Sequence, residues 1–297
     1  MLEYIKTADS VIKDLSGYIS PELNDGNLSA NMGKLIHYLS KYGYIDSEKQ
    51  PTLIDIVTGT VKLKNFFKVQ SSNLIDAKIF GLVNTPRCSV PDFMRTEAAR
   101  WRKTNLTYYI ARRDSDLPAD VWDAQIEQAW RYWMEVADIK VTRTNNQNNA
   151  DIIHDIGQGQ RDNFDGPSGT LAWAYLPNGS DQQLLNKFDV SETWIIPNSN
   201  TRGIRLVNVC THEFGHLLGL SHSQVQSALM APYYSVNIAT PQANDDIPRI
   251  QKLYGIPKQE PKPPTEPNLP DPTNNEEIII KLQGRVVIPG YKLTKIQ

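Results

Sequence analysis

Three histidines and one glutamate lie within the eleven residues 212–222, at a spacing that suits a metal ion used for hydrolysis. On a helix, His212 and His216 lie one turn apart on the same face, so both imidazoles can bind one ion. Gly219 can adopt the positive φ that ends such a helix, after which the chain can turn back and bring His222 to a third position. Three protein ligands leave the fourth position of a tetrahedral zinc ion open for water, as in catalytic zinc sites.

Glu213 lies beside the first two histidines and can supply the base that hydrolysis needs. A zinc ion would lower the pKa of a water molecule and polarise a carbonyl, while Glu213 accepts the proton of the water and passes it to the leaving amine. A pair of histidines at this spacing also arises by chance on amphipathic helices. The extension through Gly219 and His222 favours the metal site, so the pattern predicts zinc-dependent hydrolysis of an amide bond.

The segment after the third histidine resembles that of a known protease family. Met230 lies where metzincin proteases place a methionine turn beneath the zinc. Ser223, directly after the third histidine, and the run Pro232-Tyr233-Tyr234 resemble the matrixin branch, the matrix metalloproteinases. This resemblance covers residues 30–256 and implies a zinc endopeptidase that cleaves peptide bonds in extracellular proteins. A metzincin of another branch is the alternative, and Ser223 argues against it.

Cys88 lies in a segment bracketed by Pro86 and Pro91, which is expected to be extended. A thiolate is a good zinc ligand, so a cysteine on such a segment can take the position that catalytic water needs. The segment resembles the cysteine switch of matrixins, in which a flanking arginine and aspartate pair with each other, here Arg87 and Asp92. The resemblance implies a latent proenzyme inhibited by its own propeptide. Matrixins usually have glycine after this cysteine, where the present chain has serine.

The remaining cysteine, Cys210, lies two residues before His212 and is expected to be a small buried side chain. Two cysteines form no disulfide framework and do not indicate a compartment.

By the same resemblance, residues 164–194 contain a loop that wraps a structural calcium ion. Oxygen ligands from carboxylates and loop carbonyls suit this hard cation. The implied ligands are the carboxylates of Asp165, Asp189 and Glu192 and the backbone oxygens of Gly166, Ser168 and Thr170. A solvated turn at the Asp-Gly pair is the alternative.

Matrixins also carry a second, structural zinc ion held by three histidines and an aspartate. The corresponding positions here are Gln158, Gln160, Trp173 and Lys187, none of which is a usual zinc ligand. His154 lies nearby and is expected to be an ordinary histidine on the face of a strand. We therefore expect one zinc ion per chain.

The resemblance also implies residues that contact a substrate. Leu171 and Ala172 belong to the expected edge strand 171–175, to which an extended peptide would add through main-chain hydrogen bonds. Asn208, four residues before the first zinc histidine, would line the deep pocket on the primed side, with Pro232 and Tyr234 as its outer wall. A medium apolar side chain such as leucine is the expected occupant. The alternative for Asn208 is that it faces solvent.

Apolar patterns predict the elements that position these residues, and the N-terminal part reads as a small helical bundle. The candidate helices are Glu3–Leu15, Met32–Tyr42 and Leu53–Phe67. Their order resembles a matrixin propeptide. It also resembles peptidoglycan-binding-like modules, so binding of a cell-wall polymer is the rival function of this part.

Further along the chain, strands alternate with helices. Strands are predicted at Leu106–Ile110, Ile139–Thr142 and Asp151–His154. Pro118 opens a helix with one apolar stripe that should face the core: Trp122, Ile126, Ala129, Trp130 and Trp133. A last helix is expected at Asp246–Tyr254, where acidic residues cap the N-terminus, or pair with a new amino terminus as in the family. This pattern favours an α+β or α/β domain, and the resemblance implies a twisted, mostly parallel five-stranded sheet with three helices.

The 297 residues are expected to form a helical propeptide at 1–98, a catalytic domain at 99–256, and a proline-rich linker with a short tail at 257–297. The tail is too short for the C-terminal propeller domain common in the family.

The formal net charge of −2, with mixed signs along the chain, indicates neither nucleic acid nor an anionic membrane as a partner. No apolar run approaches the roughly 18 residues of a membrane span. Residues 1–20 show no secretory signal, so secretion is expected only from the family resemblance. The expected partners are protein or peptide substrates and the chain's own propeptide, with the chain as a monomer.

Overall fold

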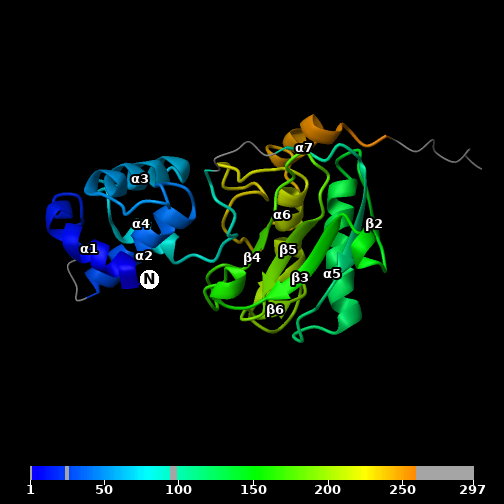
Figure 1. Cartoon of the computed structure of the whole chain (residues 1–297), viewed down its shortest axis with the longest axis horizontal. Coiled ribbons are helices and arrows are strands. Elements are labelled where there is room, and N and C mark those ends of the chain that lie inside the picture. Colours follow the sequence, from blue (N-terminus) through cyan, green and yellow to red (C-terminus); the bar gives the residue numbers. More distant parts are fainter. Residues whose placement is uncertain (1, 24–26, 94–98, 259–297) are drawn as a thin grey trace, which may run out of the picture. The chain divides into compact units, whose positions relative to one another are not determined.

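A computed structural model describes residues 2–23, 27–93 and 99–258 of the chain. The N-terminal part consists of α1 (Leu2–Leu15), the 3₁₀ turn η1 (Pro21–Leu23), α2 (Leu28–Lys41), α3 (Leu53–Phe66) and α4 (Ala77–Val83) (Figure 1). The three expected helices are confirmed, with α2 beginning four residues earlier than predicted. The short helix α4 was not predicted.

Polar caps and apolar burial explain these helices. At the start of α3, the Thr52 hydroxyl accepts the N–H of Asp55, and the Asp55 carboxylate accepts the N–H of Thr52, which forms a capping box. At the start of α4, the Asp76 carboxylate accepts the N–H of Ile79. Ile79 is fully buried in the apolar core between the helices. A cap and this burial stabilise a helix of only seven residues.

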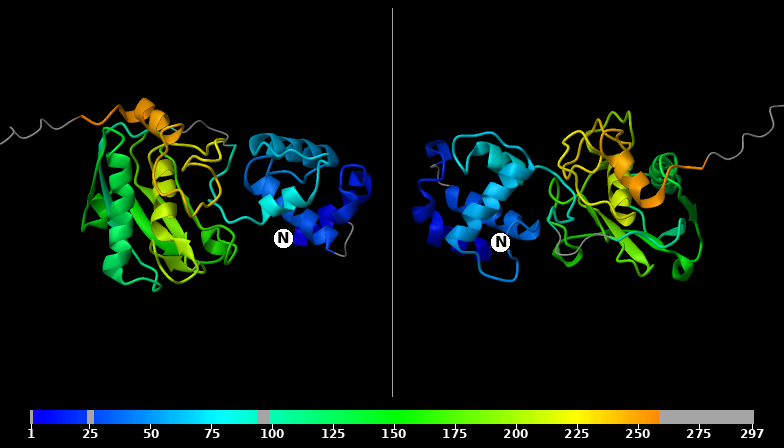
Figure 2. Two further views of the ribbon diagram at one scale, coloured as in Figure 1. Left: turned by 180° about the vertical axis from the view of Figure 1, so that it is seen from behind. Right: turned by 90° about the horizontal axis from the view of Figure 1, so that it is seen from above.

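The following part contains a five-stranded sheet. Its strands are β1 (Asn105–Ile110), β2 (Lys140–Arg143), β3 (Ile152–Gly157), β4 (Ala172–Ala174) and β5 (Leu184–Asp189). The strand order is β2-β1-β3-β5-β4, and only β4 runs antiparallel to its neighbour. The expected mostly parallel sheet is confirmed, and β4 forms one edge (Figures 1 and 2).

Strand β5 was not predicted, although it lies inside the sheet between β3 and β4. Along β5, buried side chains alternate with partly exposed ones, and Leu184, Asn186 and Phe188 are buried. Asn186 is polar, so the alternation of apolar residues is interrupted at the middle of the strand. Its burial has a reason that only the fold reveals, because its Oδ1 lies 2.6 Å from Nδ1 of His154 on the neighbouring strand.

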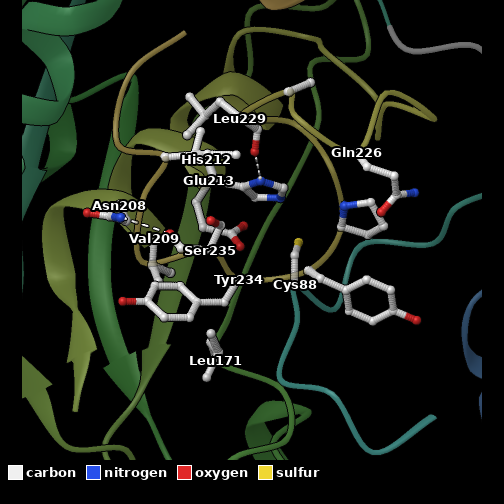
Figure 3. A pocket seen from close by; sticks show the side chains of 14 residues that line it. Cys88, Leu171, Asn208, Val209, His212, Glu213, Gln226, Leu229, Tyr234 and Ser235 are labelled. Carbon is white, nitrogen blue, oxygen red and sulfur yellow. Dashed lines mark hydrogen bonds between the residues drawn. The ribbon is translucent and has the colours of Figure 1, made fainter. Parts of the chain in front are cut away.

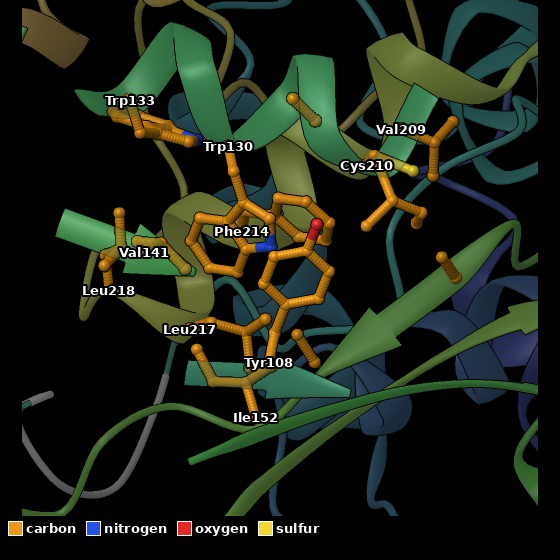
Figure 4. Close-up of a cluster of buried hydrophobic side chains, with 14 of the residues drawn as sticks. Tyr108, Trp130, Trp133, Val141, Ile152, Val209, Cys210, Phe214, Leu217 and Leu218 are labelled. Atoms are coloured by element: carbon orange, nitrogen blue, oxygen red, sulfur yellow. The ribbon is translucent and has the colours of Figure 1, made fainter. Parts of the chain in front are cut away.

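Two helices, α5 (Ala119–Met134) and α6 (Leu206–Leu217), pack with the sheet around a large aromatic core (Figure 4). The predicted stripe of α5 is confirmed, since all five of its residues are buried. The Trp130 ring stacks on Phe214 of α6 with centroids 4.2 Å apart, and Phe214 stacks on His154 at 4.5 Å. These rings fix α6, the helix with the histidine pair, against the sheet.

A third helix, α7 (Asp246–Tyr254), and a two-stranded sheet of β6 (Trp194–Ile195) and β7 (Ile204–Arg205) complete this part. The prediction that acidic residues cap α7 is wrong. Asp245, at the N-cap, makes no capping bond and pairs with Arg249 at 3.0 Å. The buried carboxylate of Asp246 instead accepts three backbone N–H groups, those of Leu229, Met230 and Gln242. Asp246 therefore ties α7 to the turn at Met230.

Within the described ranges, none of the helices combines the length and apolar character needed to cross a membrane. Residues 259–297, which hold most of the expected linker and the tail, lie outside those ranges.

Candidate metal centre and substrate groove

Helix α6 delivers the first two histidines and the glutamate. All twelve of its residues are buried, so His212 and His216 enter the interior of the protein together with Glu213. The chain then turns at Gly219, whose φ of +102° is the conformation expected there. A Cβ atom at this position would lie 2.5 Å from the carbonyl oxygen of Ala99. Only glycine suits this turn, which brings His222 back toward the helix.

The structure brings Cys88 together with the three histidines. Each residue offers one ligand atom, these atoms lie within 4.8 Å of one another, and all four side chains are buried. The Cys88 sulfur is 3.4 Å from Nε2 of His216, which is 3.2 Å from Nε2 of His222. Within residues 2–23, 27–93 and 99–258, this is the only such group of histidine, cysteine or acidic side chains.

The outer nitrogen of each imidazole has a partner that orients the ring. Nδ1 of His212 lies 2.8 Å from the carbonyl of Leu229, and Nδ1 of His216 lies 2.7 Å from that of Leu220. Nδ1 of His222 lies 2.8 Å from Oδ1 of Asp92. Each ring therefore presents Nε2 toward the centre of the cluster.

The inner atoms of the cluster fit a zinc ion. Nε2 of His212 is buried without a hydrogen-bond partner, and the other two Nε2 atoms face each other. A cation among them would give all three nitrogens a partner, and nitrogen with sulfur is the donor set that zinc prefers. Burial lowers the pKa of His212 to about 3, which keeps the imidazole neutral as metal binding requires.

Glu213 is placed to handle a proton beside this cluster. It is fully buried, and neither carboxylate oxygen has a conventional hydrogen-bond partner. Burial raises the pKa of Glu213 to about 8, an effect that the Cys88 thiol partly offsets. Figure 3 shows the Cys88 sulfur and the Glu213 carboxylate in one pocket with His212.

The two residues that flank Cys88 form the expected ion pair. Nη2 of Arg87 lies 2.7 Å from Oδ1 of Asp92, Nη1 lies 3.0 Å from Oδ2, and both side chains are buried. The guanidinium lies over the Tyr42 ring at 3.6 Å, and the Tyr44 hydroxyl donates to Asp92 at 2.7 Å. Burial alone would raise the pKa of Asp92, but Arg87 and His222 hold it well below its usual range.

The segment around Cys88 lies along the edge of the sheet. The N–H of Arg87 donates to the carbonyl of Gly169, the N–H of Leu171 donates to the carbonyl of Arg87, and the N–H of Ser89 donates to the carbonyl of Ala172. On its other side, the N–H of Cys88 donates to Pro232, and the N–H of Tyr234 donates to Pro86. The segment therefore uses the main-chain groups that an added peptide strand would need.

Four of the five expected substrate-contacting residues line the pocket beside Glu213: Leu171, Asn208, Pro232 and Tyr234. Ala172 lies next to them in β4. The alternative that Asn208 faces solvent is wrong, because the residue is buried and its Nδ2 donates to the carbonyls of Ser235 and Val236. Val209 and Ile238 also line the pocket and were not predicted, since neither stands out from ordinary core residues in the sequence.

In the loop expected to bind calcium, Asp165, Asp189 and Glu192 do not form a compact group of ligand atoms in the part of the chain that the structure describes. Asp165 accepts the N–H of Thr170 at 2.6 Å, and Glu192 accepts that of Ser168 at 2.7 Å. Oδ2 of Asp189 is buried and lacks a hydrogen-bond partner among the described residues, so a cation could use it as a ligand. Burial, reinforced by the neighbouring acidic side chains, raises the pKa of Glu192 to about 7.

At the positions of the second matrixin zinc, an ion pair and hydrogen bonds connect the loop at residues 158–163 to the sheet. Nζ of Lys187 lies 2.5 Å from Oδ1 of Asp162. The Trp173 indole donates to the carbonyl of Asp162, and the N–H of Gln158 donates to its carboxylate. His154 is buried and accepts the N–H of the Trp130 indole at 3.0 Å. The role of Asp162 was missed because nothing in the sequence pairs it with Lys187.

Comparison with known proteins gave a family match over this part of the chain. The family model described as matrixin matches residues 100–255. An interstitial collagenase of Equus caballus is 37% identical over 268 residues, which cover 84% of this chain and 55% of the relative. An interstitial collagenase of Sus scrofa is 34% identical over the same shares, and matrix metalloproteinase-17 of Homo sapiens is 29% identical over 81% of this chain and 44% of the relative. The chain thus spans about half the length of these relatives.

Proposed function

The chain belongs to the matrixin family, and on that premise we propose that it is a latent zinc-dependent endopeptidase. One observation carries the proposal. Three buried imidazoles converge on a common centre beside a buried carboxylate that has no conventional hydrogen-bond partner, and a thiol from a distant segment completes the group. A closed structural zinc site would have no need for Glu213.

In this proposal, His212, His216 and His222 hold the zinc ion. When bound, zinc supplies Lewis acidity toward water and toward the carbonyl of the peptide. Glu213 accepts a proton from the attacking water as the carbon–oxygen bond forms, and it returns the proton to the leaving nitrogen as the carbon–nitrogen bond breaks. Both oxygens of this buried carboxylate lack a conventional hydrogen-bond partner, so they are available to accept and return that proton.

Substrate positioning follows from main-chain groups at the sheet edge. The N–H of Leu171 and the carbonyl of Ala172 on one side, with the N–H of Tyr234 and the carbonyl of Pro232 on the other, can bind an extended peptide between them. The pocket lined by Asn208 and its neighbours would then take the side chain that follows the scissile bond. Its apolar lining supports a medium apolar side chain there.

Latency follows because the segment with Cys88 now holds those same main-chain groups. In the proposal, the Cys88 thiol takes the fourth zinc position, and the Arg87–Asp92 ion pair keeps the segment in the groove. We further propose that residues 1–98 act as the inhibitory propeptide, residues 99–256 as the catalytic domain and residues 257–297 as a linker and tail. The substrates would be extracellular proteins, and the chain would act as a monomer.

Calcium is proposed as a second, structural cation. Asp165, Asp189 and Glu192 supply carboxylates around the loop, and Gly166, Ser168 and Thr170 supply backbone oxygens. The buried, unpartnered oxygen of Asp189 supports a cation at this place.

Latency is tested by comparing two cysteine substitutions. Cys88→Ala removes the thiol beside the histidines, whereas Cys210→Ala removes an equally buried thiol that is not part of the cluster. We expect the zinc-loaded Cys88→Ala chain to hydrolyse a generic protein substrate before any cleavage of the chain itself, while Cys210→Ala stays latent. A Cys88→Ala, Glu213→Gln chain should be inactive. No gain of activity in Cys88→Ala would contradict the proposal that latency depends on the thiol.

A further inference from the structure

The three imidazoles of the metal centre differ in where their outer partners come from. His212 and His216 are oriented by backbone carbonyls that follow them in the chain, those of Leu229 and Leu220. His222 is oriented by the carboxylate of Asp92, which lies 130 residues earlier. Both members of this pair have no solvent-exposed side-chain surface. One histidine therefore depends on the inhibitory segment for its orientation.

Both oxygens of the Asp92 carboxylate accept two contacts each. Oδ1 lies 2.7 Å from Nη2 of Arg87 and 2.8 Å from Nδ1 of His222. Oδ2 lies 3.0 Å from Nη1 of Arg87 and 2.7 Å from the Tyr44 hydroxyl. The carboxylate thus joins the helical part, the switch segment and the metal centre at one buried point. The ion pair with Arg87 describes only half of these contacts.

A carboxylate in this position has a definite effect on a metal ligand. It fixes the proton on Nδ1, leaves the lone pair of Nε2 directed at the metal, and makes the imidazole a stronger donor. We propose that Asp92 is a positioning residue for the zinc centre in addition to being the partner of Arg87. The segment then supplies two groups, the Cys88 thiol at the fourth position and the Asp92 carboxylate behind His222. The inference rests on the proposed zinc site.

The proposal predicts that the segment strengthens zinc binding in two separable ways. The share of the zinc affinity that is due to Asp92 should persist when the thiol is removed, because the carboxylate contacts His222 and not the metal. Loss of such an outer partner typically weakens metal affinity by about 10- to 100-fold. Removal of the whole segment should therefore weaken zinc binding by more than loss of the thiol alone.

Zinc affinity is measured by competition with a chromogenic chelator, using full-length chains that carry Cys88→Ala. Adding Asp92→Ala should weaken zinc binding by about 10- to 100-fold. Asp92→Asn keeps the shape of the side chain and one acceptor oxygen, so zinc affinity should fall by less than in Asp92→Ala. Asp155→Ala is the matched control, since it removes a carboxylate of β3 that pairs with Arg112 and should leave zinc affinity unchanged. Equal affinity in the parent and both Asp92 variants would overturn the proposal.

A second measurement excludes an indirect effect through loss of folding. In ¹⁵N-histidine NMR spectra of the zinc-loaded Cys88→Ala chain, Nδ1–H of His222 should exchange slowly with water, like those of His212 and His216. Asp92→Ala should remove only the His222 signal. Retention of that signal, or loss of all three, would contradict a specific role. A chain that binds zinc with this dependence on Asp92 but hydrolyses nothing would refute the proposed function and not this inference.

Discussion

Replacement of Tyr44 by phenylalanine tests how the segment around Cys88 is held against the sheet edge. Tyr44 is buried, and its hydroxyl donates to Oδ2 of Asp92 at 2.7 Å. Tyr44→Phe removes this oxygen but keeps the ring, whose contacts with Phe66 and Phe93 have centroid distances of 6.3 and 5.2 Å. The substitution therefore removes one hydrogen bond to a buried charge and little else.

The size of the effect follows from the remaining contacts. A hydrogen bond to a charged group contributes about 1.5–3 kcal/mol. Oδ2 of Asp92 keeps its contact with Nη1 of Arg87 at 3.0 Å, so the loss should lie in the lower part of that range, about 1.5–2 kcal/mol. Because 1.4 kcal/mol corresponds to a factor of ten, the open population of the segment should rise by about 10- to 30-fold.

The assay is the rate at which an aromatic disulfide reagent labels Cys88 in the zinc-loaded chain, with the buried Cys210 replaced by alanine. When closing is faster than labelling, the rate is proportional to the open population. Tyr4→Phe is the matched control, because within the described residues its hydroxyl makes one long contact, at 3.4 Å, with Ser40. We expect a change below about twofold in the control. An unchanged labelling rate in Tyr44→Phe would refute the view that Tyr44 and Asp92 hold the segment.

Three further predictions address stability and calcium. Burial lowers the pKa of His154 from 6.5 to about 4, so the folded chain resists protonation of this imidazole. Between pH 7 and pH 4, the free energy of unfolding in urea should therefore fall by about 3 kcal/mol more in the parent chain than in His154→Gln. Parallel pH dependence of the two chains would contradict this. In the same assay, Gly219→Ala should lower the free energy of unfolding by about 1–3 kcal/mol, because Gly219 has a positive φ. Gly81→Ala should be neutral or stabilising, because a Cβ at that position meets nothing within 4 Å. Calcium at about 100 times its Kd should raise the Tm of the chain by several degrees. Asp189→Asn should abolish this rise, whereas the control Asp155→Asn should keep it. A rise that survives in Asp189→Asn would argue against the proposed site.

The parts of the site that lie on one continuous segment could be predicted from the sequence. Helix geometry fixes the relation of His212 to His216, and the backbone freedom of Gly219 made the return of His222 predictable. The pairing of Arg87 with Asp92 followed from the family resemblance.

Contacts between distant segments could not be predicted. Local spacing gives no sign that Asp92 faces His222, that Asp246 binds the turn at Met230, or that Asp162 pairs with Lys187. Strand β5 was missed for a related reason. Its buried Asn186 looks unfavourable in a strand until His154 on the next strand is placed beside it.

Zinc titration into metal-free Cys88→Ala chain, with hydrolysis of a generic protein substrate as the readout, tests the central claim most directly. The three histidines form one centre, and the residues expected at the position of a second zinc, Gln158, Gln160, Trp173 and Lys187, are not usual zinc ligands. Activity should therefore rise in proportion to added zinc and reach its maximum at about one equivalent per chain, with elemental analysis giving the same ratio. Full activity without zinc, or a requirement for two zinc ions per chain, would contradict the account.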